Sequence, residues 1–112
     1  MVSIEKQAEL FAALSDPTRL RLFCLLAAQS APGALCVNAL AGRLGVSQSA
    51  VSQHLKVLRA AGLVSGRRCG YRVHYWVNSR VLEQFSLFLK SMSSVKVKGS
   101  EKEKQKEKKN VS

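Results

Sequence analysis

The chain has 112 residues, of which 46% are hydrophobic, and 18 are lysine or arginine against seven acids. This length predicts one domain with a modest core. The formal net charge of +11 favours an anionic partner, nucleic acid or an acidic membrane, over a basic surface with no particular partner. No apolar run approaches the roughly 20 residues of a membrane-spanning helix, and the first residues show no signal pattern. We therefore expect no membrane partner. Because the three cysteines show no close pairing, we also expect a protein of the reducing cytoplasm.

The composition changes sharply near Val95. Residues 96–112, KVKGSEKEKQKEKKNVS, hold seven lysines and three glutamates and offer almost nothing to bury. We expect a disordered Lys/Glu-rich tail there and a folded domain over residues 1–95. The tail accounts for +4 of the net charge and the domain for the remaining +7, so the domain is basic without the tail. The tail is either a solubilising extension or a non-specific contact to phosphate.

Capping residues and apolar periodicity predict two helices in the first thirty residues. Ser3 can cap the first helix, whose apolar residues at helical spacing are Ile4, Ala8, Phe11 and Leu14. Asp16 is a good N-cap for the second helix, and Pro17 suits its first position. The core face expected for this second helix comprises Leu20, Phe23, Leu26 and Ala27.

Two further helices are predicted in the centre of the chain. A short one covers about residues 37–44 and ends at Gly45, whose missing Cβ suits a left-handed turn. Ser47 then caps a helix that runs to about Ala60, with Gly62 as its stop. The buried seam of this helix comprises Val51, Leu55 and Leu58.

After Leu63 the apolar period changes from helical to two. The run LVSGRRCGYRVHYWVN has strand-forming residues on either side of Cys69–Gly70, which predicts a β-hairpin with a basic tip. Asn78 or Ser79 then caps a last helix with a wide apolar stripe. The stripe comprises Val81, Leu82, Phe85, Phe88, Leu89 and Met92. Because this stripe is wide for the end of a small domain, we expect part of it to face a partner subunit.

The short helix, the glycine turn and the capped helix have the proportions of a helix-turn-helix. In such a pair the second helix lies in the DNA major groove, with its N-terminal residues at the base edges. Short hydrogen-bonding side chains suit that position, and an acid would be repelled by phosphate. Glutamine can bond adenine, and serine can bond a base or a phosphate. The predicted base-reading residues are Gln48, Ser49, Ser52 and Gln53, and the alternative is a solvated polar face.

The hairpin supplies further groups that suit DNA. Arginines surround its tip, with Tyr71 between them: Arg67, Arg68 and Arg72. Guanidinium groups pair well with phosphate oxygens and enter narrow minor grooves, although the same charges could serve to keep an edge strand soluble. Lys56 and Arg59 lie later on the predicted recognition helix and suit phosphate contacts. His54 lies next to the buried seam and either packs there or donates to phosphate.

The residues ALSDPTRLRLFCLL, followed by LCVNALAGRLGVSQSAVSQHLKVLRAAGLVSGRRCGYRVHYWVN, resemble the ArsR/SmtB family of bacterial and archaeal transcriptional repressors. The resemblance covers about Leu10 to Met92. It implies a mainly α winged helix-turn-helix with about five helices and two strands, in which the first and last helices join a homodimer. It further implies a repressor that binds a palindromic operator in double-stranded DNA and is released by an inducer, often a metal ion.

The metal sites of that family are incomplete in this sequence. Many members carry ELCVCDL at the short helix, with two cysteines that bind soft metals or arsenite. Here the stretch is ALCVNAL, which keeps Cys36 but has Asn38 in place of the second cysteine. One thiolate does not make a closed soft-metal site. Other members bind zinc with Asp and His on the last helix, which here offers only Glu83.

We therefore expect no cofactor, with Cys36 as the one candidate metal ligand should the inducer be a metal or metalloid. Near Cys36 in the sequence, only Arg43 could lower the pKa of its thiol. Cys24, within LFCLL, is expected to be a small buried core residue. A regulator with another inducer, or with none, is the leading interpretation.

Two other classes of function compete with a repressor. A winged-helix protein-interaction module would share the fold without binding DNA specifically. An enzyme is disfavoured because the two histidines and the four acids before the tail include no pair at a spacing typical of acid–base or metal chemistry. We predict a non-enzymatic DNA-binding repressor.

Overall fold

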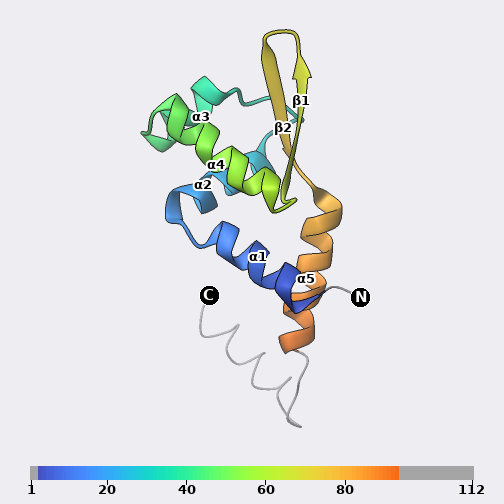
Figure 1. Ribbon diagram of the computed structural model, residues 1–112. Helices are drawn as coiled ribbons and strands as arrows, with labels where there is room; N and C mark the ends of the chain where they lie inside the picture. The colour runs from blue at the N-terminus through green and yellow to red at the C-terminus, as the bar shows by residue number, and fades with distance from the viewer. Residues whose placement is uncertain (1–2, 94–112) are drawn as a thin grey trace, which may run out of the picture.

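The computed structural model describes residues 3–93, which form five helices and one β-hairpin (Figure 1). In chain order the elements are α1 (Ile4–Leu14), α2 (Pro17–Ala28), α3 (Val37–Leu44), α4 (Gln48–Ala60), β1 (Val64–Cys69), β2 (Arg72–Val77) and α5 (Ser79–Ser93). The predicted fold class is confirmed. The predicted tail lies outside the described residues. Within residues 3–93, no helix is both long enough and apolar enough to cross a membrane.

The predicted helix starts are fixed by capping side chains. Ser3 Oγ accepts a hydrogen bond from the backbone amide of Lys6 at 3.0 Å, and Asp16 does the same for Arg19 at 2.9 Å. At α4, Ser47 Oγ accepts from the amide of Ala50 at 3.1 Å. Each cap satisfies an amide that has no partner within its own helix, which is why the chain turns helical there.

The core lies between α1, α2, α3, α4 and the start of β1, and Phe85 closes it from α5. The predicted seam of α4 is confirmed, since Val51, Leu55 and Leu58 are all buried. Phe85 also packs edge-on against Phe11 of α1, with ring centroids 4.9 Å apart and an interplanar angle of 71°. The two helices at the ends of the described chain therefore contact each other, as Figure 1 shows.

The buried face of α1 does not follow the apolar spacing seen in its sequence. Ile4 is 67% exposed and Phe11 is 44% exposed, whereas the buried positions are Gln7, Leu10 and Ala13. Both sets have helical spacing, and packing against α2 and α4 selects the second. As a result Gln7 is only 1% exposed, and its two amide atoms find no hydrogen-bond partner among the described residues.

The predicted core face of α2 is half right. Phe23 and Leu26 are buried, together with Leu22, but Leu20 is 43% exposed. Cys24 is also exposed, so the expectation of a buried thiol is wrong. The helix presents 22, 23 and 26 to the core, which turns 20 and 24 toward the opposite side.

The hairpin turns one residue later than expected. Cys69 pairs with Arg72, so the turn consists of Gly70 and Tyr71 rather than Cys69–Gly70. Gly70 has φ +65°, and no non-glycine residue among those described has positive φ, which is the pattern of a type II′ turn. This turn matches the twist of the two strands.

The hairpin is attached to the body through β2 and its flanks. The carbonyl of Tyr75 accepts hydrogen bonds from Gln29 Nε2 at 2.8 Å and from the amide of Gly33 at 3.3 Å. Beyond β2, the amide of Asn78 donates to the carbonyl of Leu63 at 2.9 Å. Asn78 then caps α5, with Oδ1 3.5 Å from the amide of Val81, which decides between the two predicted caps.

Candidate nucleic-acid interface

The polar face of α4 is positioned by the turn that precedes it. Gly45 adopts φ +67°, and the amide of Val46 donates to the carbonyl of Ala41 at 3.2 Å, so α3 ends and α4 starts within three residues. Because the seam of α4 is buried, its opposite side faces outward. Among its first nine residues, the exposed polar ones are Gln48, Ser49, Ser52, Gln53 and Lys56. Four of these five were the predicted base readers.

The hydrogen bonds of these residues differ along α4. Gln48 Nε2 donates to Asn38 Oδ1 of α3 at 3.1 Å, and the hydroxyls of Ser47 and Ser49 lie 3.1 Å apart. Ser52 and Gln53 have no partner for their side chains among residues 3–93. The first turn of α4 is thus held to its neighbours, while the second turn presents free donors and acceptors.

The basic tip of the hairpin is confirmed as exposed, and Tyr71 at the turn is fully exposed. Arg67 pairs with His74 across the strands, and Arg68 pairs with Val73. Because successive side chains in a strand point to opposite faces, Arg67 and Arg68 lie on opposite faces of the hairpin. Arg68 shares its face with Tyr75.

Two cavities lie between α4 and the hairpin. One of 210 Å³ is lined by Ser52, Lys56, Arg59 and Tyr75. The other, of 400 Å³, also contains Ser52 and Tyr75, together with Cys36 and Arg72. The guanidinium of Arg59 lies over the Tyr75 ring, 5.9 Å from its centroid, and joins α4 to the hairpin. The two cavities together form a groove between α4 and the hairpin. No acid lines this groove, so it suits a chain of phosphates.

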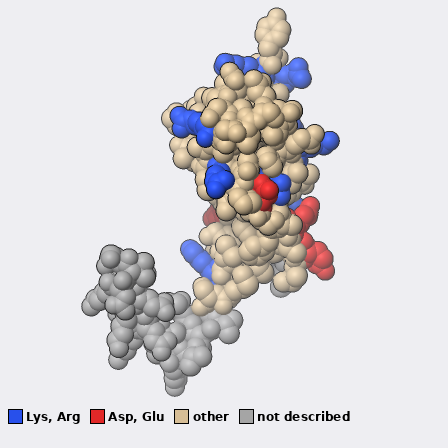
Figure 2. Space-filling view, turned by 90° about the vertical axis from the view of Figure 1, so that its left-hand side faces the viewer, with Lys and Arg blue, Asp and Glu red and all other residues tan. Residues whose placement is uncertain are grey.

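Charge is divided along the molecule. Residues 37–77 contain six basic residues and no acid, the basic residues being Arg43, Lys56, Arg59, Arg67, Arg68 and Arg72. The acids of residues 3–93 are Glu5, Glu9, Asp16 and Glu83, all outside that segment. On the face shown in Figure 2, only blue charged side chains surround the hairpin at the top, and the red ones lie lower, among further blue ones. Such a distribution attracts a polyanion to the hairpin and α4.

His54 lies on the α2 side of α4. Its ring is half-buried, and Nδ1 is 3.5 Å from Nη1 of Arg19. Arg19 also donates to the carbonyl of Ala13 at the end of α1. The structure therefore separates His54 from the exposed polar residues of α4.

Two residues of the groove were not predicted. Asn38 holds Gln48, and Tyr75 lines both cavities and stacks with Arg59. The alternation of β2 contained a signal for Tyr75, because it shares a face with Val73 and Val77. No local signal pointed to Asn38, whose partner is ten residues away.

Cys36 is half-buried at the start of α3. The backbone amide of Ala39 lowers the pKa of its thiol, and the charge of Arg72 lowers it further, while burial acts in the opposite direction. The expectation that Arg43 is the one group near Cys36 in the sequence that lowers this pKa is wrong, because the nearby amide of Ala39 does so, and the hairpin adds Arg72 from a distant part of the sequence. Within residues 3–93 of one chain, no three His, Cys, Asp or Glu side chains gather to hold a metal ion.

A short helix, a glycine turn, a capped helix with an outward polar face and a basic hairpin define a winged helix-turn-helix domain. Residues 16–65 match the family model described as "Bacterial regulatory protein, arsR family". The chain belongs to this family, and the resemblance found in its sequence is confirmed.

Two relatives and one solved structure agree with this assignment. A transcriptional repressor SmtB homolog from Synechocystis is 49% identical over 71 residues, which are 63% of this chain and 51% of that protein. The chain therefore spans about half the length of that relative. An HTH-type transcriptional regulator of Methanocaldococcus jannaschii is 40% identical over 78% of this chain and 96% of its own. A homodimeric winged helix-turn-helix DNA-binding domain from Mycobacterium bovis superposes with a TM-score of 0.63 at 28% identity, covering 80% of this chain and 81% of that one.

Proposed function

We propose that the protein is a transcriptional repressor that binds a palindromic operator as a homodimer and leaves it when an inducer binds. The observation that carries this proposal is the second turn of α4. There Ser52 and Gln53 present unpartnered polar groups beside a basic groove that contains no acid. Side chains of this kind suit base edges, and the surrounding cations suit phosphates.

Each site residue has a role in this proposal. Those that read base edges in the major groove are Gln48, Ser49, Ser52 and Gln53. Those that contact phosphate are Lys56, Arg67, Arg68 and Arg72, while Tyr71 at the hairpin turn contacts the sugar–phosphate backbone. His54 supports α4 from the α2 side, where it faces Arg19.

The homodimer is supported by apolar surface on α1 and α5. The large apolar side chains exposed on these two helices are Ile4, Phe11, Leu87, Leu89 and Met92. The two helices contact each other, so these side chains belong to one end of the molecule. A second copy that covered this end would bury them and leave both hairpins free. The two recognition helices of this dimer would then enter major grooves about one helical turn, roughly 34–36 Å, apart.

The proposal includes neither catalysis nor a cofactor. One relative, from Escherichia coli, is named an arsenical resistance operon repressor. In this chain Cys36 is the single candidate ligand at the start of α3, and Asn38 beside it is engaged by Gln48. The residues described here do not form a complete metal site, so we propose an inducer other than a soft metal ion.

The first test is selection of bound DNA from a random pool at about physiological salt, with the mass of the complex measured by light scattering. An inverted repeat bound by two chains supports the proposal. Salt-sensitive binding without a consensus would contradict it and indicate a general DNA-coating protein. A consensus without inverted repeat would contradict the dimer. Titration of the selected fragment with zinc, cadmium and arsenite then tests the inducer, and release by one of them would restore a metal sensor.

A further inference from the structure

A second concave surface lies between α2 and α3, formed by residues other than those of the groove beside the hairpin. It encloses about 560 Å³, within the range of small-molecule sites. Its apolar lining includes Leu20 and Leu25 of α2 and Leu44 of α3, with the exposed thiol of Cys24 among them. Leu20 and Cys24 were both predicted to lie in the core, and both are exposed.

Two arginines complete the lining of this α2–α3 groove. Arg21 comes from α2 and Arg43 from the last turn of α3. Both are exposed, and neither forms a hydrogen bond or an ion pair with another residue in the described part of the chain. No acid lines the groove. Two free guanidinium groups beside an apolar floor complement a ligand that has one anionic end and one apolar end.

We propose that the α2–α3 groove binds a small amphipathic carboxylate, with its chain on Leu20, Leu25 and Leu44 and its carboxylate between Arg21 and Arg43. A second copy of this chain fits less well. A symmetric contact there would bring four arginines together with no acid among them, which costs free energy.

The groove is placed to affect DNA binding. Arg43 and Leu44 end α3, directly before the Gly45 turn that leads into the recognition helix, and α3 packs on α4. A ligand wedged between α2 and α3 would change the position of α3, and its carboxylate would offset one of the two positive charges of Arg21 and Arg43. We infer that the ligand is the inducer; this part of the inference rests on the proposed function.

Cys24 provides a direct test of occupancy that needs no DNA. In a Cys36→Ser/Cys69→Ser variant, the rate of alkylation of Cys24 by the neutral reagent N-ethylmaleimide is measured with octanoate, octanol or inorganic phosphate at equal ionic strength. Octanoate should slow alkylation in a saturable manner, and the other two should slow it far less. In the Arg21→Gln/Arg43→Gln variant, the octanoate concentration that gives half of the full protection should rise by about tenfold or more, because charge-assisted hydrogen bonds to the carboxylate are lost. Arg80→Gln, which removes an exposed charge from α5, should change nothing.

The outcomes separate the two parts of the inference. Equal protection by octanol or by phosphate, or an unchanged response in the Arg21/Arg43 variant, would overturn the site. With the unaltered chain, saturating octanoate should weaken operator affinity by about fivefold or more. Protection of Cys24 with no change in that affinity would overturn the regulatory part. Failure of the chain to bind any operator would count against the proposed function. The alkylation rate would still show whether the α2–α3 groove binds octanoate.

Discussion

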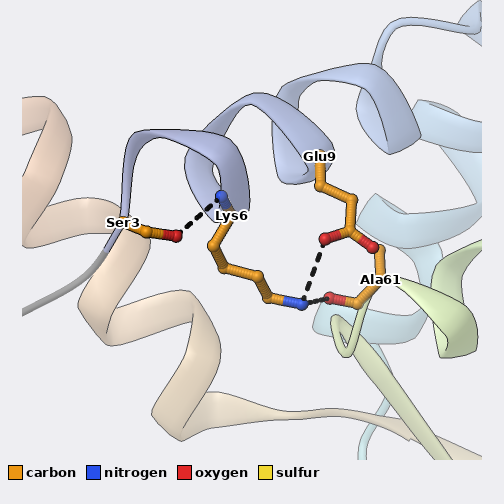
Figure 3. A network of polar contacts seen from close by, with 4 residues as sticks. All are labelled: Ser3, Lys6, Glu9 and Ala61. Carbon is orange, nitrogen blue, oxygen red and sulfur yellow. Dashed lines mark hydrogen bonds and ion pairs between the residues drawn. The ribbon is translucent and has the colours of Figure 1, made fainter.

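Lys6 Nζ donates a 2.8 Å hydrogen bond to the carbonyl of Ala61, the C-cap residue that follows α4 (Figure 3). The same amine lies 3.7 Å from Glu9 Oε2. A cation at the carboxyl end of a helix satisfies its last carbonyls and opposes the negative end of the helix dipole. The first helix of the chain thus holds the far end of the proposed recognition helix.

Lys6→Met should therefore lower the free energy of unfolding by about 1 kcal/mol, because a partly buried charged hydrogen bond is lost. It should also weaken binding to specific DNA, since α4 is less firmly held. Glu9→Gln is the matched control. The side chains of Lys6 and Glu9 are 39% and 55% exposed, so loss of their ion pair should change stability by less than about 0.5 kcal/mol. Urea unfolding that showed equal effects for both variants would contradict the role of Ala61.

Gln53→Ala and Arg68→Ala should affect DNA binding in different ways. If Gln53 reads a base, its loss should reduce discrimination between operator and random DNA by about 1–3 kcal/mol. If Arg68 contacts phosphate, its loss should weaken binding to all sequences and reduce the dependence on salt. Binding isotherms at several salt concentrations, with operator and scrambled DNA, measure both effects. If the two variants behaved alike, the division into base-reading and phosphate-contacting residues would be wrong.

Gly33→Ala should destabilise the domain and detach the hairpin from α2. Gly33 has φ +75°, and an added Cβ would overlap the ring of His74. Gly45→Ala is the control, because φ is +67° there but an added Cβ meets nothing within 4 Å. The control should cost about 1–2 kcal/mol from backbone strain alone. Thermal unfolding should show a larger loss for Gly33→Ala, and His74→Ala in that background should recover part of the difference.

Arg72→Ala should raise the pKa of the Cys36 thiol. Arg72 stabilises the thiolate from across the groove, so the thiolate forms at a lower pH in its presence. The rate of Cys36 alkylation against pH, measured in a Cys24→Ser/Cys69→Ser background, should therefore shift to higher pH in the variant. The amide of Ala39, the largest cause of the lowered pKa, is unaffected, so part of the lowering should persist. Arg67→Ala serves as control, and an equal shift in it would indicate a general field of the hairpin.

Leu87→Glu should prevent the proposed dimer. Leu87 is 58% exposed on α5, so a glutamate there is tolerated in one chain but is buried when a second copy covers this end. Light scattering should then give the mass of one chain, with a circular dichroism spectrum like that of the parent. Gln84→Glu places the same charge on an exposed polar position of α5 as a comparison. A dimer that survived Leu87→Glu would place the interface elsewhere.

The helix-turn-helix was predictable because its signals are local. Ser47, Gly45 and the buried seam of α4 lie within fourteen residues, and each acts on its nearest neighbours. The rotation of α1 was not predictable in this way, since apolar residues occur on two of its sides and a glutamine occupies a core position. The turn position was missed by one residue because Gly70 can serve in either place of a two-residue turn.

The parts of the site that the sequence did not reveal depend on contacts between distant segments. Arg72 acts on Cys36 only because the hairpin folds over the start of α3. Likewise, Arg59 of α4 lies over the ring of Tyr75 only because the fold brings β2 next to α4. The polarity of these residues was visible in the sequence, but their partners were not.

The two hydrogen bonds accepted by the carbonyl of Tyr75 divide the hairpin into a fixed base and a projecting arm. From this point the strands continue to the fully exposed Tyr71 at the turn. Along β1, exposure increases from the buried Val64 to the exposed Cys69. Because no residue between this anchor and the tip is buried, we expect the arm to tilt about the Tyr75 carbonyl while the core keeps its packing. Duplexes vary in minor-groove width with their sequence. In the proposed repressor, a hinge at Tyr75 would let the hairpin follow that variation, and the stiffness of this hinge would set how many operator shapes the protein accepts.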